Sequence, residues 1–274
     1  MIDAHELERR TGWRVVAHEI VASTNDEAAV LRDAGIDSRV VVVADRQLAG
    51  RGRGGRRFES PTGGLYASLL VAVRPTDLPA PLIAAVAVAL AEAIETVARV
   101  SVRIKWPNDL WIEGRKVAGI LTEASLSASS PAPSSVTAIV GVGVNLARVP
   151  DGLDAATSAG TTALDLHAER PTRREDVLAE FLVRLHRRIE ALARDGARAG
   201  LESDYRARLA LRGESVTFHA GSVPVEGVLV DVSMDLGLCV RDRAGAATWW
   251  PISVVRDVRP AGSERGDPPV TRAR

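Results

Sequence analysis

The chain has 274 residues, of which 46% are hydrophobic and 26% are charged, and its 35 basic side chains balance 35 acidic ones. This length suits one large domain, or a domain with a small companion, and the apolar content suffices for a packed core. The balanced charge excludes a protein that captures nucleic acid through overall positive charge. The single cysteine, Cys239, excludes an intrachain disulfide and a cysteine-based zinc site, and its apolar surroundings predict a buried thiol.

The first part of the chain mixes predicted strands with predicted helices. A short strand is predicted over residues 14–17, and the apolar runs at 40–44 and 65–73 are typical of buried strands. Residues 23–27 (STNDE) predict a helix start, because hydroxyls cap the first turn and acidic side chains favour it. The Ala-rich stretch after Pro79 predicts a helix that ends near Ala98.

The middle of the chain predicts a hairpin around the Glu113-Gly114 turn and two later helices. Residues 126–135 are rich in Ser, Ala and Pro and are predicted to form a mobile surface connection. Residues 146–161 are predicted to form a flexible loop, because they lack a convincing period. Further strands are predicted at 102–105, 109–112, 116–123 and 136–144, and helices at about 173–195 and 198–210.

After residue 212 the pattern changes to short strands separated by tight turns, which predicts a small β-barrel. The strands are predicted at 215–220, 223–232, 236–241, 247–250 and 254–258. We therefore predict an α+β domain over 1–211, an all-β module over 212–260 and a disordered tail over 261–274. The N-terminus lacks the features of a signal peptide and the longest apolar run, 82–91, is short for a membrane span, so a cytoplasmic protein is predicted.

Residues 50–57 read GRGRGGRR and lie between two predicted strands. Glycines let the backbone approach an anion closely, and Arg51 and Arg53 offer bidentate contacts to phosphate or carboxylate. The Walker A pattern is absent. The alternative is a solvated basic loop or a nucleic-acid-binding segment, but the short length favours a folded anion-binding loop.

Lys105 and Lys116 are the two lysines of the chain, and they lie eleven positions apart. A chain that uses arginine for nearly every other cation has kept an ammonium here, where a compact charge differs from a planar guanidinium. Lys116 follows the tight turn of the hairpin, so it can stabilise negative charge on a phosphate or carbonyl oxygen. Asp109, across the hairpin, would orient a lysine or amine, bind magnesium or pair with a nearby arginine.

These segments together resemble the signatures of biotin protein ligases. Residues 50–56 resemble the first signature, and 105–109 with 115–123 (RKVAGILTE) resemble the second. Residues 23–25 (STN), before them, and 141–145 (GVGVN), after them, fit the order of the same family. The resemblance covers about residues 18–146, and the C-terminal module extends it to about 260. It implies a catalytic domain similar to class II aminoacyl-tRNA synthetases, followed by an SH3-like barrel.

The resemblance implies an enzyme that makes biotinyl-5′-AMP from biotin and ATP and then transfers biotin to one lysine of a carrier domain. The implied partner is the biotin carboxyl carrier domain of acyl-CoA carboxylases, and the implied ion is Mg²⁺ without a tightly bound, protein-ligated metal. Some members carry an N-terminal DNA-binding domain, and we expect this chain to act without DNA or membrane, as a monomer or weak homodimer.

The resemblance also assigns the site. Catalysis is assigned to Lys116, Arg53 and Asp109, with Asp109 guiding the carrier lysine. The biotin site is assigned to Ser23, Thr24, Asn25, Gln47, Arg51, Gly52, Arg53 and Lys116. The nucleotide site is assigned to Arg51, Arg53, Asn108, Lys116 and Asn145, with 146–161 as the loop that closes over the adenylate.

One departure and two alternatives remain open at this point. Phe58 stands where the family often has tryptophan, which predicts weaker stacking. A lipoate or octanoate ligase of the same superfamily is the nearest alternative, although the polar set of Ser23, Thr24, Asn25 and Gln47 favours a ureido head group over an alkyl chain. A nucleic-acid-binding regulator is the alternative from another class, and a salt-dependent gel shift would identify it.

Overall fold

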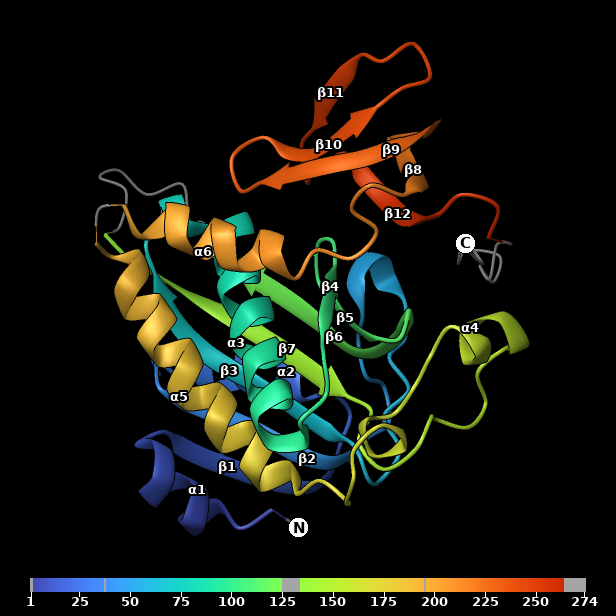
Figure 1. Ribbon diagram of the computed structural model, residues 1–274. Coiled ribbons are helices and arrows are strands. Elements are labelled where there is room, and N and C mark those ends of the chain that lie inside the picture. The colour runs from blue at the N-terminus through green and yellow to red at the C-terminus, as the bar shows by residue number, and fades with distance from the viewer. Residues whose placement is uncertain (1, 37, 125–133, 195, 264–274) are drawn as a thin grey trace, which may run out of the picture.

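The computed structural model describes residues 2–36, 38–124, 134–194 and 196–263, which fold around two β-sheets (Figure 1). The first sheet has seven strands in the order β1-β2-β3-β7-β6-β5-β4, and the second has five in the order β11-β10-β9-β8-β12. Most of the connection predicted at 126–135, and the predicted tail from 264 onward, lie outside the described residues.

The seven-stranded sheet is mixed, because β1 and β2 pair in parallel and all other neighbours pair antiparallel. Its strands agree closely with the predicted ones, except that β1 and β2 each continue several residues further. The strands are β1 (Arg14–Val21), β2 (Val40–Gln47), β3 (Leu65–Val73), β4 (Arg103–Lys105), β5 (Asp109–Ile112), β6 (Arg115–Ala124) and β7 (Val136–Val144).

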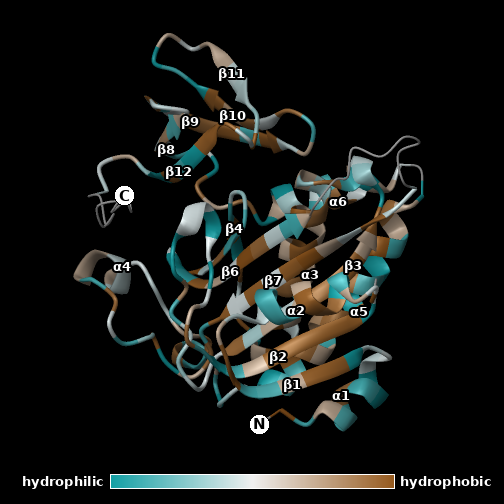
Figure 2. Ribbon diagram, turned by 180° about the vertical axis from the view of Figure 1, so that it is seen from behind, coloured by the Kyte–Doolittle hydropathy of each residue, from teal (hydrophilic) through white to brown (hydrophobic). Residues whose placement is uncertain are grey.

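Helices cover both faces of this sheet, which explains why its central strands are apolar on both sides. Val41 and Val43 of β2 belong to the main core, whereas Val40 and Val42 pack in a second cluster with Ala28 of α2. Figures 1 and 2 show α2 on one face and α3 and α5 on the other. The helices are α1 (Ala4–Thr11), α2 (Thr24–Asp33), α3 (Ala80–Ala98), α4 (Ala155–Ala159), α5 (Arg174–Leu192) and α6 (Ala197–Ala207).

Helix α3 is the central helix of the main core. By length and composition it is the one helix among the described residues that could cross a membrane, although its longest apolar run looked too short. However, 72% of its most apolar stretch is buried inside the protein, as is typical of a core helix.

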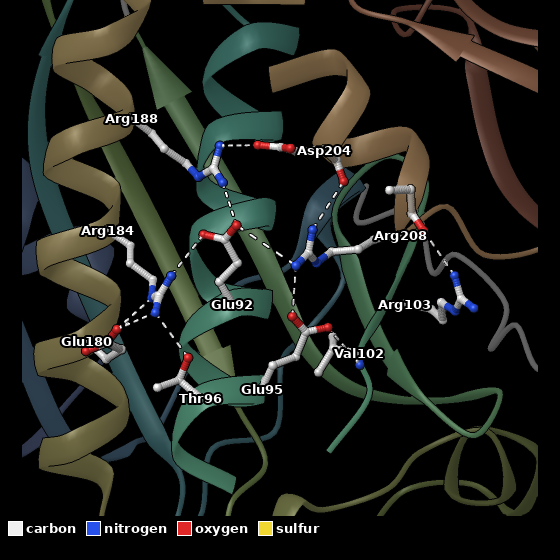
Figure 3. A network of polar contacts seen from close by, with 11 residues as sticks. Glu92, Glu95, Thr96, Val102, Arg103, Glu180, Arg184, Arg188, Asp204 and Arg208 are labelled. Carbon is white, nitrogen blue, oxygen red and sulfur yellow. Dashed lines mark hydrogen bonds and ion pairs between the residues drawn. The ribbon is translucent and has the colours of Figure 1, made fainter. Parts of the chain in front are cut away.

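An ion-pair network fixes α3 to its neighbours (Figure 3). Glu92 of α3 pairs with Arg184 and Arg188 of α5, at 3.4 and 2.6 Å. Glu95, one turn further along α3, pairs with Arg208, which directly follows α6, at 2.9 Å. The backbone of Arg208 accepts a hydrogen bond from Ile104 N at 2.8 Å, so the end of α6 is held against β4.

Two segments outside the C-terminal sheet differ from the sequence predictions. Helix α1, capped by Asp3, was not predicted, because it has only 8 residues and buries only Leu7. Residues 146–161 were predicted as a flexible loop, but they contain α4, which projects away from both sheets in Figures 1 and 2. Asp154 caps α4 by accepting a hydrogen bond from Thr157 N. This local signal was overlooked because the segment has no apolar period.

The C-terminal sheet contains the five predicted strands, all paired antiparallel, and is compatible with the expected SH3-like module. Its strands are β8 (Ser215–Ala220), β9 (Val223–Ser233), β10 (Gly237–Arg241), β11 (Ala247–Trp250) and β12 (Val255–Pro260). Cys239 is 5% exposed in β10, so the predicted buried thiol is confirmed. Burial also raises the pKa of this thiol.

Candidate active site

The polar residues 23–25 lie at the N-terminus of α2, where Ser23 caps the helix and accepts a hydrogen bond from Asn25 N at 3.3 Å. All three are at most 4% exposed. Gln47, at the end of β2, accepts from the Thr24 backbone at 2.8 Å and from its hydroxyl at 3.1 Å. The structure therefore brings the four residues predicted to bind the biotin head into one buried polar cluster.

Two further residues, Ser68 of β3 and Glu123 of β6, complete this cluster. Ser68 is fully buried and bonds to Thr24 Oγ1 at 2.7 Å and to Asn25 Oδ1 at 2.5 Å. Glu123 Oε2 accepts from Asn25 Nδ2 at 2.7 Å. Gly141 of β7 lies beneath, and a Cβ there would be 2.3 Å from Asn25 Oδ1. The amide can occupy this place because residue 141 has no side chain.

The Gly/Arg loop (residues 50–57) folds over the cluster and contains a single 3-10 turn at Arg53–Gly55. Arg51 Nη2 pairs with Asp26 at 3.1 Å and with Glu123 at 2.9 Å. Arg53 Nη1 donates to Asn108 Oδ1 at 2.9 Å, and burial lowers the pKa of the Arg53 guanidinium. The two arginines therefore have different partners, Asp26 and Glu123 for Arg51 and Asn108 for Arg53.

Phe58 follows the loop and packs against the sheet at Gly143. A Cβ on Gly143 would lie 2.5 Å from the Phe58 ring, so the glycine makes room for the aromatic side chain. The ring lies edge-to-face with Tyr66, with centroids 6.4 Å apart, and Lys116 Nζ is 5.9 Å from its centroid. Phe58 thus fixes the end of the loop beside the hairpin lysine.

Lys116 and Asp109 form a direct ion pair across the hairpin, with Nζ and Oδ1 2.7 Å apart. Burial disfavours the charge on Asp109, but the ammonium groups of Lys116 and Lys105 outweigh this effect and hold its pKa below the usual range. Burial lowers the pKa of Lys105, which lies 5.3 Å from the Trp111 ring centroid. The ion-pair partner of Asp109 is therefore Lys116, and not an arginine as one reading of the sequence expected.

The two asparagines predicted to bind the nucleotide lie on either side of β6. Asn108 Nδ2 donates to the Ile120 carbonyl at 2.7 Å, and Asn145 Nδ2 donates to the Thr162 carbonyl at 3.2 Å. Asn145 is 4% exposed, and its Oδ1 has no hydrogen-bond partner among the described residues. A buried amide oxygen without a donor is costly, which is consistent with a ligand N–H binding there.

The backbone around the hairpin is fixed from two sides. Lys116 N donates to the Gly160 carbonyl and Thr162 N donates to the Lys116 carbonyl, each at 2.8 Å, so the end of the 146–161 segment docks beside Lys116. Tyr205 of α6 donates its buried hydroxyl to the Pro107 carbonyl at 3.1 Å. Burial raises the pKa of Tyr205, so the phenol remains a donor.

Sequence reasoning missed Ser68, Tyr205 and the contact of Glu123. Ser68 is the one polar residue in an apolar strand (LYASLLVAV), which is a signal that could have been used. Glu123 lies in the segment 115–123 that resembles the second signature, but no function was predicted for it. Nothing in the sequence indicates that Arg56 of the Gly/Arg loop pairs with Asp257 of β12, at 3.2 Å, because such contacts depend on how the two sheets meet.

Several known proteins are similar to this chain. The profile of the Biotin/lipoate A/B protein ligase family matches residues 18–145. The biotin–[acetyl-CoA-carboxylase] ligase of Paracoccus denitrificans is 33% identical over 231 residues, covering 81% of this chain and 92% of that protein. The corresponding ligase of Mycobacterium tuberculosis is 31% identical, with 84% of each chain covered.

Two further similarities concern length and fold. The bifunctional ligase/repressor BirA of Bacillus subtilis is 34% identical over 65% of this chain, and the match spans about half of that protein (54%). The structure of a biotin protein ligase from Aquifex aeolicus in complex with biotin and ATP superposes with a TM-score of 0.74 at 24% identity, covering 90% of this chain and 99% of that one.

The Aquifex aeolicus likeness concerns the fold, and it confirms the expected α+β class with a catalytic domain similar to class II aminoacyl-tRNA synthetases. The sequence identities to the two biotin–[acetyl-CoA-carboxylase] ligases extend over 92% and 84% of those proteins, so the relationship includes sequence as well as fold. This chain therefore belongs to the biotin protein ligases of the Biotin/lipoate A/B protein ligase family.

Proposed function

We propose that this chain is an ATP-dependent ligase that forms biotinyl-5′-AMP and transfers biotin to one lysine of a biotin carboxyl carrier domain. The observation that carries the proposal is the position of a closed, neutral hydrogen-bonding cluster beside a group of cations. Thr24, Asn25 and Gln47 form the neutral cluster, and Arg51 joins it to the Gly/Arg loop through Glu123. A ligand with a polar uncharged head and a carboxylate tail fits this order.

The first half-reaction requires two anions to meet, and the cations provide for this. The biotin carboxylate attacks the α-phosphate of ATP, and pyrophosphate leaves with its magnesium ion. Arg51, Gly52, Arg53 and Lys116 hold the carboxylate and the α-phosphate, where fixed cations stabilise the charge of the transition state. Asn108 and Asn145 bind the adenine, and the unpartnered Asn145 Oδ1 accepts from the base.

The second half-reaction uses the same pocket. The carrier lysine attacks the carbonyl carbon of the mixed anhydride, an amide forms and AMP leaves. Asp109 guides the incoming amine, since a carboxylate with a lowered pKa stays ionised and attracts an ammonium. Residues 146–161 exclude water from the adenylate, and their docking on the backbone of Lys116 supports this role.

We also propose the wider organisation of the enzyme. Residues 1–211 form the catalytic domain and 212–260 the SH3-like domain, with 261–274 as a tail. Magnesium enters with ATP as the ion of the co-substrate. The enzyme works in the cytoplasm as a monomer or weak homodimer, without DNA or a membrane.

The test is ATP–pyrophosphate exchange in magnesium with biotin, octanoate or lipoate as the carboxylate. Exchange with biotin alone supports the proposal. Exchange with octanoate or lipoate alone keeps carboxylate adenylation and overturns the substrate. A folded protein that exchanges with none of the three, but shifts DNA in a salt-dependent manner, would be a binding protein on a ligase scaffold.

A further inference from the structure

A continuous chain of hydrogen bonds made by side chains runs from the Gly/Arg loop through the proposed biotin head site to the backbone of Phe58, which directly follows the loop. It begins at Arg51 and Glu123 and passes through Asn25 and Ser68. It continues through Thr24, Gln47 and Ser60, whose hydroxyl donates to the Phe58 carbonyl at 2.9 Å. Every link is 3.1 Å or shorter.

The Glu123 end fixes where the protons lie. A carboxylate paired with Arg51 can only accept, so Asn25 must turn its Nδ2 toward Glu123 and its Oδ1 toward Ser68. Asn25 Oδ1 can only accept as well. The Ser68 hydroxyl must therefore give its one proton to Asn25, across a distance of 2.5 Å.

The Gln47 end of the chain independently fixes which atoms donate and which accept. The Thr24 backbone N–H can only donate, so Gln47 turns its Oε1 toward Thr24 and its Nε2 toward Ser60, at 2.8 Å each. Thr24 Oγ1 thus lies between the Ser68 hydroxyl, whose proton is committed, and the Gln47 carbonyl. Its own proton must go to one of these two atoms, and it has none left to donate to a ligand.

We propose that Ser68 and Glu123 are positioning residues that fix the donor and acceptor polarity of the head site, so that Thr24 presents only lone pairs and selects a head group with an N–H donor. This inference rests on the proposed function, and it explains how the site distinguishes a cyclic urea from an alkyl chain. An alkyl head would leave the Thr24 lone pairs buried without a donor, which a hydrogen-bonding site rejects strongly.

The test measures biotin affinity by calorimetry, and KM for ATP by pyrophosphate exchange, in near-isosteric variants. Ser68→Ala removes the donor to Asn25, and Glu123→Gln replaces an obligate acceptor by an amide that can also donate. We expect Ser68→Ala to bind biotin at least 10-fold more weakly, with KM for ATP within twofold of the wild type. Val177→Ala, a fully buried change on α5 away from the site, is the control for lost stability.

A double-mutant cycle separates this role from a general structural one. Both variants release the same Asn25 amide, so the double variant should lose little more affinity than the weaker-binding single variant. Losses that multiply would overturn the proposal, as would wild-type affinity in Ser68→Ala. The proposal would also be overturned if Ser68→Ala weakened biotin and ATP binding together, in proportion to a lowered melting temperature, as expected for the Val177→Ala control.

Two arrangements keep the test decisive. Wild-type protein that neither binds biotin nor supports exchange would refute the proposed function itself, before any variant is made. If Ser68→Ala does not fold, Ser68→Cys keeps the size and offers only a weak donor, and the same criteria apply to it.

Discussion

The glycines of β7 provide a sharp prediction, because two of them make room for different parts of the site. Gly141 lies under Asn25 and Gly143 lies under Phe58, two residues apart on the same face of one strand. Gly141→Ala and Gly143→Ala add the same methyl group to the same strand. Each variant therefore serves as the control for the other.

The magnitude for Gly141→Ala follows from the contact distances. The new Cβ would lie 2.3 Å from Asn25 Oδ1, whereas ordinary contacts begin at 3.4 Å, so the amide must move by about 1 Å. That movement breaks its bonds to Ser68 and to the charged Glu123, at about 1 kcal/mol for the first and about 2 kcal/mol for the second. If the amide relaxes into the head site, biotin must displace it again, and the dissociation constant should rise by roughly 100-fold.

Gly143→Ala should act elsewhere. Its Cβ would displace the Phe58 ring, which lies beside Lys116, so we expect a reduced rate of ATP–pyrophosphate exchange with a much smaller change in biotin affinity. Titration calorimetry with biotin, exchange assays and melting curves would be recorded for both variants. A folded Gly141→Ala protein with wild-type biotin affinity, or equal losses of biotin affinity in both variants, would refute the reasoning.

Four further predictions concern single side chains. Lys116→Arg should fold normally yet lose most adenylation, because a planar guanidinium cannot occupy the place of the ammonium 2.7 Å from Asp109; near-normal exchange would remove Lys116 from the mechanism. Arg53→Gly should release adenylate that labels bystander lysines, as seen by blotting, and labelling confined to the carrier would contradict this. Because folding lowers the pKa of Asp109, the ionised carboxylate stabilises the protein above the unfolded pKa of about 3.9, and this stabilisation disappears as the pH falls through the folded pKa. The difference in melting temperature between wild type and Asp109→Asn should therefore shrink only in acid. A difference that already shrinks near neutral pH would be inconsistent with the ion pair. Glu92→Gln should lower the unfolding free energy by about 2 kcal/mol in denaturant titrations with exchange rates unchanged, and an unaffected midpoint would mean that the network in Figure 3 does not stabilise the helices.

The strands and the candidate site could be predicted to different extents, for physical reasons. Local patterns were sufficient for β3 and α3, because apolar runs and flanking prolines act within one element. They failed for α1 and α4, which are short helices held by a cap more than by buried side chains. In these two, a capping carboxylate carries information that hydrophobic periodicity does not.

The site shows the same division. Gly141 and Gly143 could be recognised as a motif, but only the structure shows that one accommodates Asn25 and the other Phe58. Ser68 could not be connected with Thr24, because 44 residues separate them and the contact depends on the packing of α2 against β3. Charge and motif indicated which groups matter, whereas hydrogen-bond direction required the fold.

The most direct test of the central claim is mass spectrometry of a purified biotin carboxyl carrier domain after incubation with this protein, biotin and ATP. The account predicts one biotin on one lysine of the carrier, with no product when ATP is omitted. An unmodified carrier in the presence of folded protein, or a carrier that receives octanoate or lipoate but no biotin, would contradict it.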